Sequence, residues 1–453
     1  MEPADLQIAA PPAESLPVPE KGPRILIMKT ISIIAATVSG NRGAEAMLTT
    51  AIGRIRNRYP EANFNIYSYY PGRDGELIDD PRIRVFSATP LYLVSVLLPC
   101  SLLLTLLKAL HLKSLAKLVP ESIRSLDGSD VLIDLAGVSF IDGREKFLPY
   151  NVLTLAPAIL LDTPVVKFSQ ACGPFNNPLN RFLARHTLSR IDKIFARGLK
   201  THQHLQSLSL ETVHPDPVAD VAFLHQAQDR ISDEGRQQLA DLGNRLKSET
   251  RKLIGICPSS VLAAISDRQE SSYHNQIAAL CHQLMAQGYA VLLYPNATRE
   301  GEMSKLRNND LPVIRRIADR LKGDNPTLES LYHVDFDINT PGIKQLMGHC
   351  RLVMVSRFHA MIAALATGQP VIVLGWSHKY REVMDFFGLG DLVFDFSQLN
   401  SEFMLNTIRN TLDQESSIRQ QIKQHQESAR ASAYQQFDYL YNLLGRANSC
   451  KQS

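Results

Sequence analysis

Residues 351–375 read RLVMVSRFHAMIAALATGQPVIVLG, and this stretch decides the fold class. Its apolar run Leu352–Val355 predicts a buried strand, and Val371–Leu374 predicts a second one. Between them, the turn Ser356-Arg357-Phe358-His359 opens a helix of small residues over 359–366. Strand, helix and strand in this order form a parallel β-α-β unit, which indicates an α/β protein.

The same alternation of strands and helices continues over most of the chain. At 453 residues the protein is too long for one ordinary core, so we expect two domains. The predicted fold class is α/β, with two facing Rossmann-like, doubly wound domains and a C-terminal helical tail. We place a disordered leader at 1–23, an N-terminal domain at 24–225, a linker at 226–250, a C-terminal domain at 251–400 and C-terminal helices at 401–453.

The composition narrows the choice of partners. Apolar residues make up 45% and charged residues 21% of the chain, as in folded globular proteins. The net charge of +3 is close to neutral, and basic and acidic residues interleave, so we expect no nucleic-acid partner. The six cysteines form no C-x-x-C pair, which predicts reduced thiols, a cytoplasmic protein and no metal site.

One apolar segment stands inside the predicted N-terminal domain. Pro90–Leu107 is 18 residues without a charge, and Lys108, Lys113 and Lys117 follow it. The run is just long enough to cross a bilayer, but Pro99 interrupts it, and a crossing would divide one domain between the two sides of a membrane. We therefore expect 90–118 to form a re-entrant or interfacial helix pair at the inner face of the cell membrane. The alternative is a buried core helix.

The turn at 356–359 carries the clearest chemistry. Arg357 and His359 stand where a strand ends and a helix begins, so the guanidinium, the imidazole and the first helix amides converge. This combination can bind an anion and donate a proton to it. The alternative for a generic turn is that Arg357 pairs with a carboxylate and His359 caps the helix.

The wider sequence resembles a known family. Residues 356–389, SRFHAMIAALATGQPVIVLGWSHKYREVMDFFGL, resemble the signature of polysaccharide pyruvyl transferases, in which an S-R-[LF]-H-A turn precedes a G-x-P-V strand and a K-x-R helix. Weaker landmarks of the same family occur in the expected order at Gly40–Ala46 (GNRGAEA), Asp134–Phe140 (DLAGVSF), Ser169–Phe175 (SQACGPF) and Ala196–Gly198 (ARG). The resemblance extends over about residues 25–400.

The resemblance implies a fold and a reaction. It implies two domains arranged as in GT-B glycosyltransferases, with the acceptor bound by the N-terminal domain and the donor by the C-terminal domain. It also implies transfer of a pyruvyl group from phosphoenolpyruvate to sugar hydroxyls of a cell-surface polysaccharide or lipid-linked precursor, with a cyclic ketal as product. Phosphoenolpyruvate is then a co-substrate, and no cofactor is required.

These implications assign roles to individual residues. His359 suits the general acid that protonates the enol methylene, and Arg357 suits the donor's carboxylate or phosphate. We expect further donor contacts from Ser356, Ser259, Ser260, Lys379 and Arg381. We expect the acceptor to meet Asn41, Gly43, Glu45 and Gln170. The alternatives are a solvated helix face for Lys379 and Arg381, and a loop-holding role for Gln170.

The chain also departs from the family pattern. Ala44 replaces the acidic residue of the early loop, and the glycine-rich loop is reduced to Ala136-Gly137-Val138. Two other functions therefore stay open. One is a GT-B glycosyltransferase using a nucleotide sugar, which would need a carboxylate near the ribose that we do not find in a suitable place. The other is a catalytically inactive binding or assembly subunit of polysaccharide synthesis, against which the presence of both Arg357 and His359 speaks.

Overall fold

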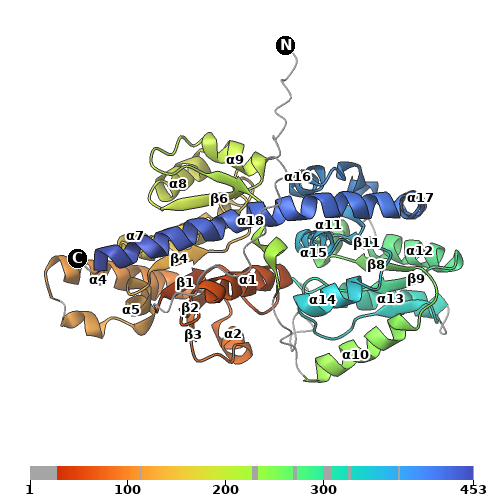
Figure 1. The fold of residues 1–453 in the computed structure, drawn as a ribbon, viewed down its shortest axis with the longest axis horizontal. Coiled ribbons are helices and arrows are strands. Elements are labelled where there is room, and N and C mark those ends of the chain that lie inside the picture. Colours follow the sequence, from red (N-terminus) through yellow and green to blue (C-terminus); the bar gives the residue numbers. More distant parts are fainter. Residues whose placement is uncertain are drawn as a thin grey trace, which may run out of the picture.

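The computed structural model describes residues 28–451, except 113, 227–232, 269–272, 299–307, 325–327 and 376–377. The predicted leader at 1–23 lies outside the described residues. The chain forms two domains, each built on a parallel sheet with helices on both faces (Figure 1). This confirms the predicted α/β class with two doubly wound domains.

The first domain contains a seven-stranded sheet in the order β3-β2-β1-β4-β5-β6-β7. Every pairing is parallel, and the strands are apolar and mostly buried, as expected when helices cover both faces of a sheet. The strands are β1 (Thr30–Ile34), β2 (Asn63–Ser68), β3 (Ile83–Ser87), β4 (Val131–Asp134), β5 (Val165–Gln170), β6 (Lys193–Arg197) and β7 (Asp216–Val218). The main helices are α1 (Arg42–Arg58), α2 (Pro71–Leu77), α5 (Glu121–Asp127), α6 (Leu148–Leu153), α7 (Ala156–Leu160), α8 (Pro178–Leu188) and α9 (Leu199–Gln206).

The second domain repeats this topology with a six-stranded sheet in the order β10-β9-β8-β11-β12-β13. Its strands are β8 (Leu253–Cys257), β9 (Ala290–Leu293), β10 (Leu331–His333), β11 (Leu352–Val355), β12 (Val371–Gly375) and β13 (Val393–Asp395). Its helices are α11 (Ser260–Arg268), α12 (Tyr273–Ala286), α13 (Leu311–Asp324), α14 (Thr340–Met347), α15 (Phe358–Ala366) and α16 (His378–Phe386). The central pair β8 and β11 places the ends of both strands, Cys257 and Val355, side by side.

The predicted linker is partly wrong. Most of its residues form helix α10 (Asp233–Lys247), whose Leu239, Leu242 and Leu246 are buried in the same apolar core as α14. An amphipathic helix with three buried leucines is bound to the body by the hydrophobic effect, so this segment is part of the second domain.

The C-terminal tail is helical, as predicted. It consists of α17 (Ser401–Asp413) and α18 (Glu415–Lys451). Helix α18 runs across both domains (Figure 1, blue). On the second domain Gln426 donates to the carbonyl of Leu365 at 2.7 Å, and on the first domain the ring of Phe437 packs edge-on against Phe168. The largest cluster of buried apolar residues accordingly includes side chains of both domains and of α18.

The apolar insertion forms one continuous helix rather than the predicted pair. It runs as α3 (Pro90–Tyr92), a π-helical turn (Leu93–Leu97) and α4 (Leu98–Ala109), and a short 3₁₀ turn follows at Leu115–Leu118. Pro99 lies just after the π-helical turn, and the helix continues through it. The alternative of a buried core helix is also wrong, because only 22% of this segment is buried.

Candidate active site between the domains

Arg357 occupies the turn between β11 and α15. Its backbone is extended, with φ −121° and ψ 134°, and its side chain reaches a buried carboxylate, Asp310. Arg357 Nε donates to both Asp310 oxygens at 3.2 Å, and Nη2 donates to Asp310 and, at 2.8 Å, to Ser260 Oγ. Burial alone would lower the pKa of Arg357, but the charge and hydrogen bonds of Asp310 outweigh it and raise that pKa. Arg357 therefore does pair with a carboxylate, as the alternative interpretation of this turn expected.

Asp310 also organises the loops around this arginine. One oxygen accepts the backbone N–H of Ser260 at 2.9 Å, and the other accepts those of Asn296 at 3.1 Å and Ala297 at 2.9 Å. The loops that follow β8 and β9 are thus tied to one buried carboxylate. Among the described residues, Nη1 of Arg357 has no acceptor, so this edge of the guanidinium is available to an anion.

His359 lies in the first turn of α15 and faces the first domain. Its Nε2 is buried and has no hydrogen-bond partner among the described residues, and it lies 3.7 Å from Oδ2 of Asp220. Asp220 is fully buried and also accepts from Arg197 Nη1 at 3.0 Å. Burial would raise the pKa of Asp220, but His359 and Arg197 together hold it well below its usual range. A carboxylate that stays ionised beside an imidazole can hold the ring in one orientation.

The first turn of α1 packs directly against His359. A Cβ built on Gly43 would lie 2.0 Å from Nδ1 of His359, so only glycine fits at this position. Asn41 holds the turn in place, because its Oδ1 accepts the backbone N–H groups of Gly43 at 3.1 Å and Ala44 at 3.3 Å. The early loop of the first domain and the Arg357 turn of the second domain therefore meet in one place.

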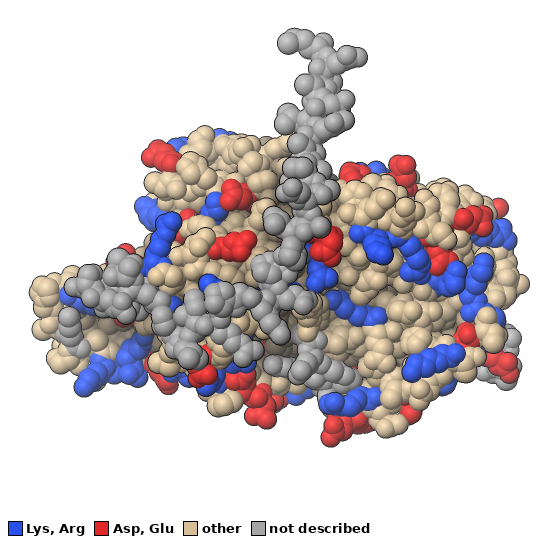
Figure 2. Space-filling view, viewed as in Figure 1, with Lys and Arg blue, Asp and Glu red and all other residues tan. Residues whose placement is uncertain are grey.

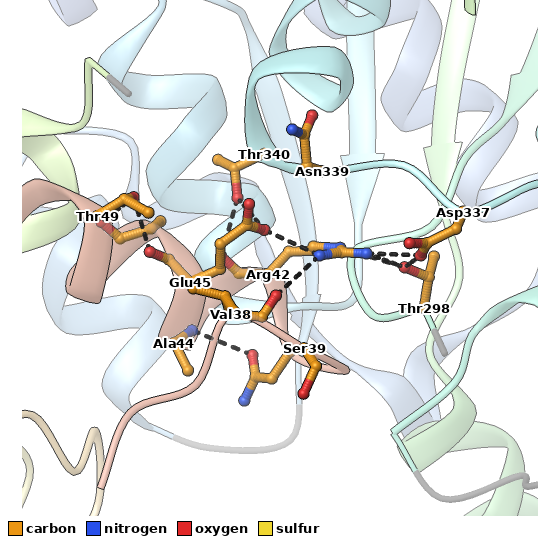
Figure 3. A network of polar contacts seen from close by, with 12 residues as sticks. Val38, Ser39, Arg42, Ala44, Glu45, Thr49, Thr298, Asp337, Asn339 and Thr340 are labelled. Carbon is orange, nitrogen blue, oxygen red and sulfur yellow. Dashed lines mark hydrogen bonds and ion pairs between the residues drawn. The ribbon is translucent and has the colours of Figure 1, made fainter. Parts of the chain in front are cut away.

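A polar network beside this contact connects the two domains (Figure 3). Arg42 on α1 donates to Thr298 Oγ1 at 2.7 Å and to Asp337 at 2.6 Å, both in the second domain. Its Nη1 donates to Glu45 at 3.1 Å, and Thr340 Oγ1 donates to the carbonyl of Arg42 at 2.9 Å. Burial raises the pKa of Glu45, against the opposing effect of Arg42. Glu45 is 6% exposed and belongs to this interdomain network, and its contact with the acceptor stays a prediction.

A cavity of about 750 Å³ opens next to these residues, between α16 of the second domain and the loops after β5, β6 and β7 of the first. Asp220 and Phe358 line it, and five cationic side chains surround it: Arg144, Arg197, Lys200, Lys379 and Arg381. Arg357 and His359 do not line the cavity. Asp220 lines the cavity and lies 3.7 Å from Nε2 of His359, so it connects the cavity to the imidazole.

Lys379 is the most strongly perturbed cation of the cavity. Burial and, after it, the positive charges of Arg197 and Arg144 lower the pKa of Lys379 to about 7. Its Nζ lies 5.2 Å from the ring centroid of Phe358, which also has the guanidinium of Arg197 over its face at 4.3 Å. Crowded cations of this kind are stabilised when an anion binds among them.

Comparison with known proteins identifies the family. Residues 41–378 match the polysaccharide pyruvyl transferases. The chain belongs to the polysaccharide pyruvyl transferase family. One relative is the amylovoran biosynthesis protein AmsJ of Erwinia amylovora. It is 23% identical to this chain over 416 residues, which cover 88% of this chain and 96% of that protein.

Solved structures agree with the fold. The UDP-GlcNAc 2-epimerase from Neisseria meningitidis superposes with a TM-score of 0.54 at 10% identity, over 92% of this chain and all of that one. The UDP-GlcNAc 2-epimerase from Methanocaldococcus jannaschii gives a TM-score of 0.52 at 11% identity, over 84% of this chain and 92% of that one. At such identities the likeness shows the GT-B-like fold alone.

The geometry supports some of the residues expected for a pyruvyl transferase site and reassigns others. Lys379 and Arg381 line the cavity, although Arg381 also donates to the carbonyl of Val393 at 3.0 Å. Ser260 lies beside Arg357 and accepts a hydrogen bond from it. The part of the motif formed by Trp376 and Ser377 lies outside the described residues.

Three predicted site residues have internal roles instead. Ser356 is 2% and Ser259 1% exposed, and both contact the hydroxyl of Tyr273: Ser356 through Oγ at 3.1 Å and Ser259 through its N–H at 3.2 Å. Gln170 is fully buried; it accepts from Ser139 at 3.0 Å and donates to the carbonyl of Asp134 at 3.2 Å. None of the three lines the cavity, and their contacts with donor or acceptor stay predictions.

Sequence reasoning missed the two buried carboxylates. Asp310 precedes a predicted helix and has the signature of an ordinary helix cap. Asp220 lies in the apolar stretch Val218–Leu224, which we had taken as the end of the first domain. A lone acid among buried apolar residues was the available signal, since such groups are rarely buried without a partner.

Proposed function

We propose that the protein transfers the pyruvyl group of phosphoenolpyruvate to two hydroxyls of one sugar, forming a cyclic ketal on an exopolysaccharide or its lipid-linked precursor. Family membership and the relative in amylovoran biosynthesis support the reaction class and the saccharide acceptor. We further propose that the reaction takes place in the cytoplasm, where the precursor is built.

The observation that carries the proposal is the buried Nε2 of His359, which has no hydrogen-bond partner among the described residues and lies 3.7 Å from the ionised Asp220. A buried ring nitrogen without a partner is unfavourable unless a ligand or a proton satisfies it. The carboxylate of Asp220 can orient the imidazole, and an oriented imidazole can serve as a general acid. His359, which lies where the two domains meet, is therefore suited to deliver a proton.

The reaction needs this proton at a defined atom. In the first half, C3 of phosphoenolpyruvate takes a proton from the His359 imidazolium while C2 accepts a sugar hydroxyl oxygen, whose proton returns to the imidazole. In the second half, the C2–O bond to phosphate breaks, and a neighbouring hydroxyl closes the ketal as its proton passes to the departing phosphate. The products are the ketal and inorganic phosphate, and no cofactor enters the balance.

The charges around the cavity suit this donor. Phosphoenolpyruvate carries a carboxylate and a phosphate, and Lys379, Arg197 and Arg144 converge on the space next to Asp220. We assign these three to the donor. The acceptor then enters from the first domain, along Asn41 and the turn that Gly43 forms.

Acceptor-dependent phosphate release tests the proposal. Purified protein is incubated with phosphoenolpyruvate and an oligosaccharide or glycolipid acceptor from the source cells, and inorganic phosphate and the ketal are measured. His359→Gln keeps the shape of the side chain but cannot donate as an acid, so we expect release to fall by roughly a hundredfold or more. His186→Gln, at an exposed histidine on α8, is the matched control and should release phosphate at the wild-type rate.

Other results would overturn the proposal. Phosphate release that His359→Gln leaves unchanged would remove the histidine from the chemistry. Release of a nucleoside diphosphate from a nucleotide sugar, with phosphoenolpyruvate inert, would favour the glycosyltransferase alternative. Binding of the saccharide without turnover of either donor would favour the inactive assembly subunit.

A further inference from the structure

The helix Pro90–Ala109 has two apolar faces, which is unusual for a helix on the surface of a domain. Its inner face contributes Leu93, Leu97, Leu104 and Leu107 to a buried core cluster of the first domain. A helix covering a soluble domain is expected to turn charged and polar side chains outward. Here the outward face is apolar as well.

That outward face continues beyond the helix and is named here the Leu91–Leu118 face. Of the seventeen large apolar side chains that are exposed among the described residues, nine lie within this one segment. They are Leu91, Val94, Leu102, Leu103, Leu106, Leu110, Leu112, Leu115 and Leu118. Leu91 is 77% and Leu118 81% exposed, so the face extends over the whole segment. An exposed apolar patch of this size indicates a surface that binds a protein or a membrane.

The hydroxyl groups of Ser95, Ser101 and Thr105 donate to backbone carbonyls of this helix and, for Thr105, of α7 as well. Ser95 Oγ donates to the carbonyl of Leu91 at 2.7 Å, and Ser101 Oγ donates to that of Leu97 at 2.7 Å. Thr105 Oγ1 donates to the carbonyls of Ser101 at 3.0 Å and Leu160 at 2.8 Å. Hydroxyls bonded back to the helix present no unpaired donor to a surrounding phase, which is the condition for contact with lipid.

Cations flank the apolar residues. Lys108 is paired with Asp127, whereas exposed Lys117 and Arg124 have no acidic partner in the described part of the chain. Lys113 lies outside the described residues. In Figure 2 the end of the first domain, where Figure 1 places α4, is largely tan at its tip, with Lys and Arg along its lower edge. Leucines bordered by cations match the acyl boundary and the headgroups of an anionic bilayer.

We propose that the Leu91–Leu118 face binds the surface of an anionic lipid bilayer, with the helix Pro90–Ala109 lying in the plane of the interface. Length and composition alone would allow this helix to cross a membrane. Its inner leucines, however, are part of the first-domain core, and crossing would pull them out of it. The outer face of the helix thus contacts the bilayer, while its inner face stays packed in the core of the first domain. This inference stands independently of the reaction proposed above.

Vesicle flotation of the whole protein tests this inference without any substrate. The lipids are phosphatidylglycerol mixed with phosphatidylcholine, compared with phosphatidylcholine alone. We expect the protein to float with the anionic vesicles and less with the neutral ones, and high salt to reduce the difference. In the variant Leu102→Ser/Leu106→Ser, both exposed leucines are shortened, and the partition coefficient should fall by roughly tenfold or more.

The matched control is Leu179→Ser/Phe182→Ser on α8 of the same domain. These side chains are 56% and 64% exposed, compared with 50% and 55% for Leu102 and Leu106, so the two variants remove similar exposed apolar surface. The control should float like the wild type, and circular dichroism checks that both variants are folded. Equal loss in the two variants would overturn the assignment to this face.

Two further outcomes would also overturn it. Wild-type protein that stays at the bottom of the gradient with anionic vesicles does not bind lipid. If the protein instead forms a dimer by light scattering, and Leu102→Ser/Leu106→Ser makes it monomeric, a second copy of the chain covers the face. Phosphate release with a water-soluble acceptor is expected to be unchanged in this variant, so a failed membrane test leaves the catalytic proposal standing.

Discussion

The backbone of Gly43 lies against the imidazole of His359, so close that a Cβ at Gly43 would be 2.0 Å from Nδ1. The two residues belong to different domains: Gly43 to the first turn of α1, and His359 to the first turn of α15. The position of the proposed general acid is therefore set by the packing of one domain on the other.

Gly43→Ala should damage catalysis far more than stability. The added methyl group would displace the imidazole or separate the two helix ends, and a displacement of about 1 Å can reduce a rate by roughly a hundredfold. We expect kcat to fall by about this factor, with a smaller change in KM. Gly53→Ala lies on the same helix with nothing within 4 Å of the new methyl group, so it should keep full activity and raise the melting temperature slightly. Equal activity in the two variants would show that the contact is unimportant.

Asp220→Asn removes the charge beside His359 and keeps the shape. Because the imidazolium loses its carboxylate, we expect kcat to fall by roughly tenfold to a hundredfold while KM changes little. Asp216→Asn, on β7 with a side chain that is 52% exposed, is the control and should retain the wild-type kcat.

The same substitution should alter the response of stability to acid. The pKa of Asp220 is lowered in the folded protein, so its contribution to the free energy of unfolding is present above the ordinary carboxyl pKa of about 3.9 and is lost as pH falls below it. Urea denaturation at a series of pH values should therefore show a steeper acid decline for the wild type than for Asp220→Asn. Parallel curves would contradict the lowered pKa.

Lys379 should make donor binding depend on pH. With its pKa lowered to about 7, this lysine is charged below that pH and neutral above it in the free protein. A phosphomonoester is almost fully ionised above about pH 7, so the affinity for phosphoenolpyruvate should fall several-fold between about pH 7 and pH 9 as the lysine loses its proton. Calorimetry in buffers of different ionisation enthalpy should detect proton uptake on binding.

Lys379→Met should bind phosphoenolpyruvate weakly at every pH in this range. Lys200→Met, at an exposed lysine of the same cavity, should weaken binding but keep the pH dependence. The unfolded chain binds the Lys379 proton up to about pH 10, so the free energy of unfolding of the wild type gains a contribution that rises with pH above about 7. This rise should be absent from Lys379→Met.

Arg42→Ala should destabilise the protein by about 3 to 5 kcal/mol, because it leaves the buried Glu45 and the partly buried Asp337 without their counter-charge. Arg84→Ala removes one partner of an exposed pair with Glu121 and should change the free energy of unfolding by about 1 kcal/mol or less. Chemical denaturation of the two variants gives both values. A similar small effect in both would mean that the network in Figure 3 does not hold the domains together.

The regular parts of the fold were predictable from sequence because their signal is local. The strands at 352–355 and 371–374 and the helix after His359 follow from apolar runs and small residues, and β11, β12 and α15 occur there. Local patterns did not predict that Pro90–Ala109 forms one continuous helix. A π-helical turn before Pro99 lets the chain remain helical where a proline would otherwise suggest a break.

The site was predictable only in part, because its charges are paired over long distances. Arg357 and His359 stood out by their place in a strand-to-helix turn. The partner of Arg357 is 47 residues away in the sequence, and that of His359 lies in the other domain. Such pairs depend on how the sheets are wound and docked, which no local pattern encodes. The internal bonds of Gln170 agree with its loop-holding alternative, whereas no sequence pattern indicated the contact between Ser356 and Tyr273.

Helix α18 has a mechanical consequence for the cavity. It is bonded to the second domain through Gln426 and to the first through Gln436, which donates to the carbonyl of Ala219 at 3.2 Å beside Asp220. An unbroken α-helix resists bending, because bending strains its own hydrogen-bond ladder. The helix therefore resists separation of the two domains, because they cannot move far apart unless one end of it detaches or the helix bends.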